Sequence, residues 1–346
     1  MARLFDLPET KGQFQLRGIV SGTESDRFFT ERQVKNNKMM RIVNFGVDYN
    51  FDNRLYVNIT GLEQDNVYFY NKDKKDTKKI PWGNRFNFNS EGYNLIGMNV
   101  GVKKKIDPNT GEPVNDKKVL PDYDACEEIH NNLRDGCTVF VRGDLSYRSY
   151  INRSGDKVSS INLSARQVSL AKDIDFTDEK FIEKNDFNQV IVFVGINKEM
   201  DNDSKPTGRY IVSAKIVTYS TIEDAEFIIK DSKLANMFKK NLKPYNAIKV
   251  SGHMIAEAEV DVVQDEDEWG ESDAMERIAS PVRREFIITG AKGSSVDRDT
   301  YTEENIAEAI VAINNNNKAE QVFDNNNNND DDDWGNFTEE DEASAW

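Results

Sequence analysis

The sequence predicts a mainly β protein with a few helices, built from two small barrel modules and an acidic C-terminal tail. Apolar and polar residues alternate through many segments of strand length, which is the pattern of half-buried strands. An order of three strands, one helix and two further strands occurs twice along the chain. The 346 residues give each of two modules enough length to bury a core of its own.

Charge is unevenly distributed along the chain, whose formal net charge is −16. Residues 1–172 contain 27 Lys+Arg and 22 Asp+Glu, residues 173–313 contain 17 and 29, and residues 314–346 contain 1 and 10. This asymmetry indicates a basic binding module followed by acidic appendages. Two cysteines, with no secretory signal or membrane-length apolar run, predict a cytoplasmic protein without a membrane partner.

The first module, residues 1–172, begins with three predicted strands at 12–22, 40–49 and 54–61. The third strand directs Leu55, Val57 and Ile59 inward, because successive side chains of a strand point to opposite faces. Arg54 and Tyr56 fall on the opposite face. A core face backed by a polar face with an aromatic residue is typical of a barrel that binds through its outer surface.

The polar loop at 25–38 combines paired phenylalanines with cations. Its candidate binding residues are Arg27, Phe28, Phe29, Arg32, Lys35 and Lys38. Folded chains normally hide phenylalanine rings, so two interpretations stay open: the loop is tucked onto the core, or its rings stack on nucleic-acid bases.

Residues 62–122 are too long for an ordinary connection and predict an insertion, in the form of an extra hairpin or flap. The insertion has strand-like pieces at 67–70 and 94–102 and lysine clusters at 72–79 and 103–105. The lysines either extend a phosphate-binding track or form a solvated charge run on a loop.

Helical spacing then appears at 122–136, with Ala125, Ile129 and Leu133 at four-residue steps. Two more strands follow within 137–170, and Gly143 marks a bend in the first of them. Three strands, a helix and two strands is the order of the OB fold. Around the hairpin between the last two strands, the candidate binding residues are Tyr147, Arg148, Tyr150, Arg153 and Lys157.

After an acidic linker at 173–187, residues 188–313 predict a second OB-like module that ends in a short helix beginning at Thr302. The segment IKVSGHM of this module echoes VFVRGDL of the first. Its last loop, residues 264–277, is strongly acidic and unsuited to phosphates, so we assign nucleic-acid binding to the first module alone.

Residues 314–346 are of low complexity and predict a disordered tail. Trp334, Phe337 and Trp346 lie among its carboxylates. A tail that only keeps a protein soluble has little use for aromatic rings, so the pattern favours a partner-docking segment over a purely solubilising one.

The run from Asp135 to Leu170 resembles the fourth and fifth strands of bacterial and phage single-stranded-DNA-binding proteins. The acidic tail with aromatic residues is also similar to that family, in which such a tail recruits replication and repair proteins. The resemblance implies a phage-type member that binds single-stranded DNA and, through the tail, replication or recombination proteins. It also implies that Tyr150 takes the place of a stacking tryptophan, and that Arg54, Tyr56 and Arg148 belong to the DNA-binding surface.

The sequence predicts neither an enzyme nor a bound cofactor, because it contains no phosphate loop or nucleophile elbow. Cys126, His130 and Cys137 are weak candidates for zinc ligands, but a closed structural site needs a fourth ligand that is not evident. The competing hypothesis is an acidic OB-fold scaffold that binds proteins. The two hypotheses differ in whether the Arg and Tyr candidates share an exposed face.

Overall fold

The computed structural model describes residues 3–34, 37–151, 157–201, 203–257, 260–262, 276–278 and 283–325. The chain forms two units. The first barrel unit comprises Gln13–Ser146 and Asn162–Asn185. The second barrel unit comprises Met1–Gly12, Tyr147–Ile161 and Asp186–Trp346. The chain therefore passes between the two units four times.

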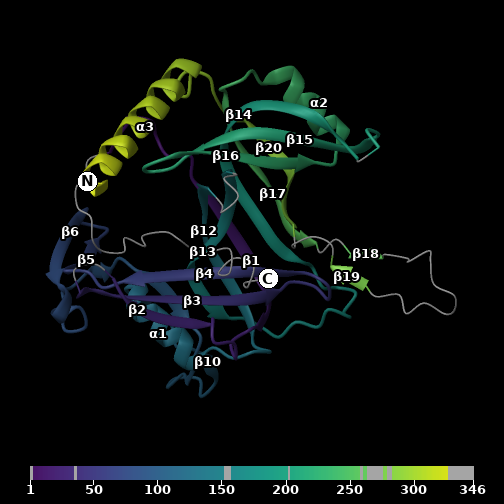
Figure 1. The fold of residues 1–346 in the computed structure, drawn as a ribbon. Coiled ribbons are helices and arrows are strands. Elements are labelled where there is room, and N and C mark those ends of the chain that lie inside the picture. The colour runs from purple at the N-terminus through teal and green to yellow at the C-terminus, as the bar shows by residue number, and fades with distance from the viewer. Residues whose placement is uncertain are drawn as a thin grey trace. The chain divides into compact units, whose positions relative to one another are not determined.

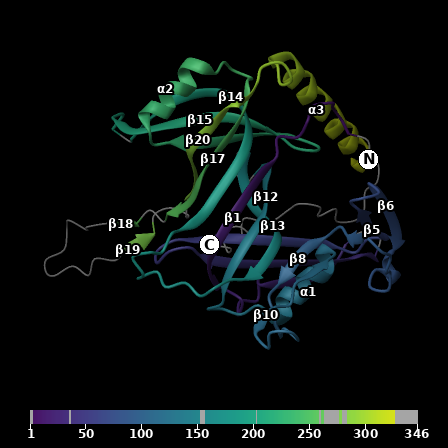
Figure 2. The same cartoon turned by 180° about the vertical axis from the view of Figure 1, so that it is seen from behind.

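Five strands close into a ring in the first barrel unit (Figures 1 and 2). They are β1 (Gly12–Ser21), β3 (Met39–Asp48), β4 (Arg54–Leu62), β12 (Thr138–Ile151) and β13 (Lys157–Leu170). Strand β1 pairs antiparallel with β3 and with β12, and β3 pairs antiparallel with β4. Strand β4 pairs parallel with β13, and β13 pairs with β12 to complete the ring. This is OB-fold topology.

Alternating apolar side chains fill the interior of this ring. Phe14 and Leu16 of β1, Phe45 of β3 and Leu55 of β4 are all buried. The helix α1 (Asp122–Asn132) precedes β12 and adds buried Ile129 to the same interior. The predicted three strands and helix are confirmed, and each observed boundary lies within a few residues of the predicted one except at the end of α1.

The insertion predicted at 62–122 contains a small sheet of its own. Its strands are β5 (Asn66–Asn71), β6 (Asp76–Pro81) and β7 (Tyr93–Leu95), in the order β6-β5-β7. Two short strands, β8 (Met98–Gly101) and β11 (Lys118–Leu120), extend the barrel sheet beside β13. The hairpin of β9 (Lys104–Ile106) and β10 (Pro113–Asn115) carries the second lysine cluster.

Outside the insertion, the short strand β2 (Phe29–Gln33) pairs with β3.

The second barrel unit repeats the same topology. Its ring consists of β14 (Lys184–Met200), β15 (Pro206–Val217), β16 (Ile222–Ile229), β17 (Ala247–Glu257) and β20 (Arg283–Asp297). Strand β16 pairs parallel with β20, and the other pairings are antiparallel. The helix α2 (Ser232–Asn241) lies between β16 and β17 in sequence, as α1 does between β4 and β12. The strands β18 (Val260–Val262) and β19 (Glu276–Ile278) pair with each other.

Two glycines mark the internal repeat. Gly143 in β12 lies against the backbone of Ser164, and Gly252 in β17 lies against the backbone of Ile287. A Cβ atom at either glycine would collide with the carbonyl oxygen of the facing strand. The similarity between VFVRGDL and IKVSGHM therefore has a structural basis. In both barrels the glycine lies where the facing strand leaves no room for a Cβ atom.

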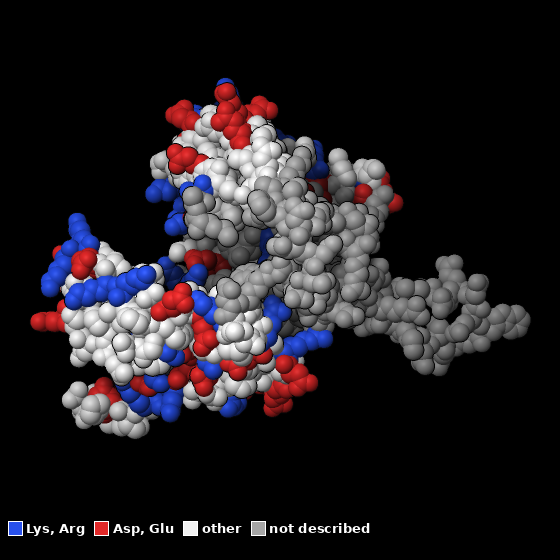
Figure 3. Space-filling view, turned by 60° about the vertical axis from the view of Figure 1, so that its left-hand side comes forward, with Lys and Arg blue, Asp and Glu red and all other residues white. Residues whose placement is uncertain are grey.

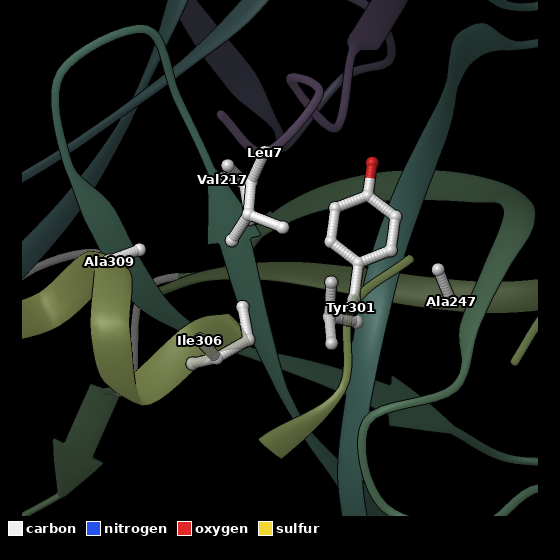
Figure 4. Close-up of a cluster of buried hydrophobic side chains, with 7 residues drawn as sticks. Leu7, Val217, Ala247, Tyr301, Ile306 and Ala309 are labelled. Atoms are coloured by element: carbon white, nitrogen blue, oxygen red, sulfur yellow. The ribbon is translucent and has the colours of Figure 1, made fainter. Parts of the chain in front are cut away.

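The N-terminal segment packs in the second barrel unit. Leu7 belongs to a buried cluster with Val217, Tyr301 and Ile306, which Figure 4 shows. Thr10 and Val217 exchange backbone and hydroxyl hydrogen bonds, and the Tyr301 hydroxyl donates to the Pro8 carbonyl at 3.1 Å. These contacts attach the start of the chain to β15 and to the segment before the helix α3 (Glu303–Asn325).

The prediction of a mainly β fold with a few helices and two tandem OB barrels is confirmed. The last helix is longer than predicted. Its cap is the Thr302 hydroxyl, which accepts a hydrogen bond from the Asn305 N–H at 3.2 Å, and it continues through the asparagine run to Asn325. Asparagine lowers helix stability by less than about 0.7 kcal/mol per residue relative to alanine, so a short run does not end a helix. Residues 326–346 and most of the acidic loop at 264–277 lie outside the described residues.

Candidate nucleic-acid interface

The central strand of the insertion sheet, β5, exposes two tyrosines. Side chains alternate along it, so Val67 and Phe69 are buried while Tyr68 and Tyr70 are 47% and 38% exposed on the other face. The sequence predicts a strand at the VYFY segment but indicates no role for its tyrosines. Period-two alternation by itself places Tyr68 and Tyr70 on the face opposite Phe69.

Neighbouring strands add polar groups to the tyrosine face. Lys79 of β6 is directly opposite Tyr68, and Asn94 of β7 is directly opposite Tyr70. Directly opposed residues of antiparallel strands project to the same face of a sheet. We call Tyr68, Tyr70, Lys79 and Asn94 the tyrosine face.

The opposite face of this sheet is packed and holds the strands in place. The rings of Phe69 and Phe88 lie 4.6 Å apart, and the Lys78 ammonium lies 4.3 Å from the centre of the Tyr93 ring. The Tyr93 hydroxyl donates to an Asp76 carboxylate oxygen at 2.6 Å, and this hydrogen bond raises the pKa of Tyr93. The tyrosine face is therefore one side of a sheet whose other side has its own contacts.

The turn between β5 and β6 presents further lysines. The Asn71 side-chain oxygen accepts hydrogen bonds from the backbone N–H groups of Asp73 and Lys74 at 3.0 and 2.8 Å, which fixes the turn. Lys72, Lys74 and Lys75 are all exposed around it. The hairpin thus carries exposed cations next to the tyrosine face. On the side of the molecule drawn in Figure 3, basic and acidic side chains are interspersed.

A partly buried ion pair fastens the insertion to helix α1. Arg85 donates to both carboxylate oxygens of Asp124, at 2.7 and 3.0 Å, and its guanidinium lies 4.3 Å from the centre of the Trp82 ring. The Trp82 ring in turn meets the edge of Tyr123 at 6.0 Å. A two-point pair of this kind fixes direction as well as distance, so the small sheet is oriented relative to its barrel.

The phenylalanines of the loop at 25–38 do not form a stacking surface. Phe28 is 3% exposed, and the ring of Phe29 stacks on His130 of α1 at 4.2 Å. The burial of Phe28 speaks against its predicted base-stacking role and favours the alternative of a loop tucked onto the core. The cations of the loop differ from one another. Arg27 and Arg32 are exposed, Lys38 pairs with Asp65 at 3.0 Å, and Lys35 lies outside the described residues.

Arg54 and Tyr56 occupy the outer face of β4, as the strand pattern predicts. The guanidinium of Arg54 donates to both oxygens of Asp48, at 2.6 and 3.2 Å. These bonds raise the pKa of Arg54, with a further contribution from the Tyr56 hydroxyl. Next to them, the Asn58 side chain donates to Asn44 at 2.6 Å. Arg54 is therefore fixed in position and always charged, but the Asp48 carboxylate neutralises its charge.

The hairpin candidates belong to the second barrel unit, unlike Arg54 and Tyr56. Tyr147 is only 9% exposed, so its predicted place on an exposed binding face is wrong. The physical reason is strand parity, since Val141, Leu145 and Tyr147 are all odd-numbered positions of β12 that point inward. Arg148 is exposed. Arg153 and the side chains of Tyr150 and Lys157 lie outside the described residues.

The three weak metal candidates do not come together. The Cys126 thiol is buried against the carbonyls of Arg41 and Ile59, and burial raises the pKa of Cys126 to about 12. His130 is exposed and Cys137 is half-buried. Among the residues that the structure describes, no three His, Cys, Asp or Glu side chains are grouped as a metal site would require.

The tail residues Trp334, Phe337 and Trp346 lie beyond the last described residue. In the part of the chain that is described, no helix combines the length and the apolar character needed to cross a membrane.

Comparison with known proteins gives a family and several distant structural likenesses. A deletion mutant of the single-stranded DNA binding protein from Thermus aquaticus is 11% identical, with a TM-score of 0.40 over 86% of this chain and 98% of that one. The wild-type Thermus aquaticus protein is 10% identical, with a TM-score of 0.41 over 82% of this chain and 93% of that one. A replication protein A heterotrimer bound to single-stranded DNA is 9% identical, with a TM-score of 0.19 over 88% and 98%.

No sequence match was found among curated proteins. A family model described as YorF matches residues 70–328, which is most of the chain, and the protein therefore belongs to the YorF family.

Proposed function

We propose that the protein binds single-stranded DNA without sequence preference, and that the tyrosine face of the insertion sheet is its main base-stacking surface. The observation that carries the proposal is the pair of exposed rings, Tyr68 and Tyr70, on a sheet that is packed on its other side. The two rings share one face of the sheet, and every nucleic-acid base has a flat face that can stack on such a ring.

The spacing of the two rings favours a single strand over a duplex. Residues two apart on one strand are about 6.6 Å apart, which is close to twice the 3.4 Å rise between stacked bases. Two neighbouring bases can each lie on one ring only if they separate from each other. A paired duplex keeps its bases stacked inside and cannot meet this condition.

Cations beside the rings supply the second requirement. Lys79 lies on the tyrosine face, and Lys72, Lys74 and Lys75 are exposed at the adjoining turn. If about four of these ammonium groups each neutralise one phosphate, the logarithm of affinity should fall with the logarithm of salt concentration with a slope of about −3. Neither the rings nor the lysines read base edges, so the binding should tolerate any sequence.

In the cell, the proposed activity is the coating of single-stranded DNA during replication, recombination and repair. The tail residues Trp334, Phe337 and Trp346 are proposed to recruit partner proteins. Burial of Phe28 and Tyr147 favours the second candidate, an acidic OB-fold scaffold that binds proteins without nucleic acid. The tyrosine face is the observation that supports DNA binding as the first candidate.

A fluorescence anisotropy titration with labelled oligo-dT and with a duplex of equal length tests the proposal. The protein should prefer oligo-dT clearly. Tyr68→Ala and Tyr70→Ala should each weaken oligo-dT binding about 5- to 150-fold, because each stacked base contributes about 1–3 kcal/mol. The matched control is Tyr219→Ala, which removes an exposed tyrosine from the second barrel unit and should leave binding unchanged.

Two results would count against the proposal in different ways. Absence of oligo-dT binding, or equal affinity for the duplex, would rule out single-stranded-DNA binding as the function. The protein-binding scaffold would then be the remaining hypothesis. Tight oligo-dT binding that survives the double replacement of Tyr68 and Tyr70 would keep the function and move the site elsewhere.

A further inference from the structure

An open apolar groove lies in the second barrel unit, between helix α2 and strand β20. Its volume is about 260 Å³. One side is formed by a stripe of α2 at positions spaced three and four apart, including Leu234, Met237 and Asn241. The other side includes Ile248, Val296 and Arg298. The groove belongs to one unit only and is separate from the tyrosine face.

Met237 is the residue that makes this groove unusual. Phe238, its neighbour on α2, is buried in the core, whereas Met237 is 59% exposed beside the groove. A flexible thioether at an open apolar surface adapts to a partner and makes favourable contacts with aromatic rings. The groove therefore suits an aromatic side chain.

The groove lies on a basic part of an otherwise acidic stretch of chain: Arg298 lines it, and helix α2 lies within a lysine-rich segment. Segment 230–243 contains five lysines and one aspartate, although residues 173–313 as a whole carry 17 Lys+Arg against 29 Asp+Glu. The five are Lys230, Lys233, Lys239, Lys240 and Lys243, and all are exposed. None of them forms an ion pair with another residue in the described part of the chain. Lys239 lies over the Tyr210 ring at 4.9 Å, and an anionic partner on α2 would meet the positive charge of this segment together with Arg298 of the groove.

The C-terminal segment 326–346 has the complementary chemistry. It contains eight Asp or Glu residues, no Lys or Arg, and the rings of Trp334, Phe337 and Trp346. The pair Trp334 and Phe337 lies between the aspartates at 330–333 and the acidic residues at 339–342. The segment combines aromatic anchors with negative charge, as an apolar groove with a lysine border requires.

The segment is also long enough. It begins directly after the last described residue of α3, which belongs to the same unit. Its 21 residues can extend about 70 Å. A unit of about 190 residues has a radius of gyration of about 16 Å, so the segment can reach any part of its surface.

We propose that the groove between α2 and β20 binds the chain's own C-terminal segment, with Trp334 and Phe337 in the apolar part and the flanking carboxylates against the lysines of segment 230–243. This site is independent of the DNA-binding proposal. It makes the tail a segment that exchanges between the groove and the proteins it recruits.

Binding of a labelled peptide of residues 326–346 to full-length protein tests this. Wild-type protein should bind the peptide weakly, because its own tail occupies the groove. The full-length variant Trp334→Ala/Phe337→Ala should bind at least tenfold more tightly, because its groove is free. Adding Met237→Glu to that variant should abolish the gain. The matched control is Met200→Glu, at a methionine of the same unit that is 54% exposed, and it should preserve the gain.

Three outcomes would overturn the proposal. One is equal peptide binding by the Met237→Glu and Met200→Glu variants. Another is equal binding of a peptide that keeps its carboxylates but lacks both rings, which would show that the lysines attract any polyanion. The third is no difference between wild type and the Trp334→Ala/Phe337→Ala variant. Circular dichroism shows whether each variant remains folded. Sedimentation shows whether the tail docks on its own copy of the chain or on a second copy. Docking in either arrangement supports the proposal.

Discussion

Tyr147 stands on the inward side of β12, and its hydroxyl has no hydrogen-bond partner among the described residues. Burial raises the pKa of Tyr147, because the phenolate would be charged in an apolar interior. An unpartnered buried hydroxyl costs about 1–3 kcal/mol. At this position the aromatic ring contributes to the core while the oxygen opposes folding.

Tyr147→Phe should therefore raise the free energy of unfolding by about 1 kcal/mol and leave oligo-dT binding unchanged. Urea denaturation measures the first effect and anisotropy the second. Tyr301→Phe is the control, because the Tyr301 hydroxyl in the same unit does donate to the Pro8 carbonyl and its loss should destabilise. Weaker oligo-dT binding by Tyr147→Phe would restore Tyr147 to the DNA interface.

The two cysteines should differ in reactivity. Alkylating reagents attack the thiolate. With a pKa of about 12, only about one Cys126 side chain in ten thousand is ionised at pH 8 in the folded protein. Cys137 is half-buried and should be alkylated first, while Cys126 should react only after unfolding. Peptide mass mapping after iodoacetamide treatment distinguishes them.

The same shift has a consequence for stability at high pH. The pKa of Cys126 is higher in the folded than in the unfolded state, so its contribution is fully present below the unfolded pKa. That contribution falls as pH rises from about 9 towards 12. A Cys126→Ala variant should show a shallower loss of stability over this range.

Some residue roles could be predicted from the sequence and others could not. The inward positions of Leu55, Val57 and Ile59 followed from alternation. The same alternation predicts that Tyr147 points inward. The aromatic and basic residues around Tyr147 favour an exposed binding site instead, and that interpretation placed it wrongly. The stacking of Phe29 on His130 joins two distant segments, and no local pattern contains it.

At the scale of elements, the main ionic attachment of the insertion sheet to α1 is the contact between Arg85 and Asp124, with side chains 18% and 10% exposed. Removing one partner of a buried pair leaves the other charge without compensation, which typically costs 3–5 kcal/mol. The insertion was foreseen from its length. Its sheet and this anchor were not, because the pairing of β5 with β7 and the contact with α1 depend on folding of the intervening turns.

Asp124→Ala should accordingly lower the free energy of unfolding by about 3–5 kcal/mol and weaken oligo-dT binding, because the tyrosine face loses its support. Denaturation and anisotropy measure the two effects. Replacing both partners, as Arg85→Met/Asp124→Leu, should recover much of the stability. An Asp124→Ala variant with unchanged stability would show that the pair does not anchor the sheet.

At the scale of the whole molecule, the element order of both barrels followed from the sequence, because each barrel repeats one pattern of strands and helix. The assignment of chain segments to the two units did not follow from the sequence. Residues 1–12 precede the first barrel in sequence, yet Leu7 and Thr10 make their described contacts in the second barrel unit. Such contacts are specified by tertiary packing, which no local periodicity records.

Cutting the chain after residue 172 should therefore destabilise the C-terminal half. The fragment 173–346 lacks Leu7, whose burial is worth about 2 kcal/mol, and the hydrogen bonds between Thr10 and Val217. Joining residues 1–12 to that fragment through a flexible linker should restore part of the loss, as urea denaturation would show. A fragment 173–346 as stable as the joined form would mean that the N-terminal segment contributes nothing.

The attachment of the N-terminal segment also decides how the chain responds to mechanical force. Both the N-terminal segment and α3 belong to the second barrel unit, while the first barrel unit is inserted between them in the chain. Tension applied to the two ends is borne first by the contacts of Leu7 and Thr10 with Val217 and Tyr301. The first barrel is shielded from the load until those contacts part, so a stretched molecule would keep the tyrosine face intact after its second barrel had begun to open.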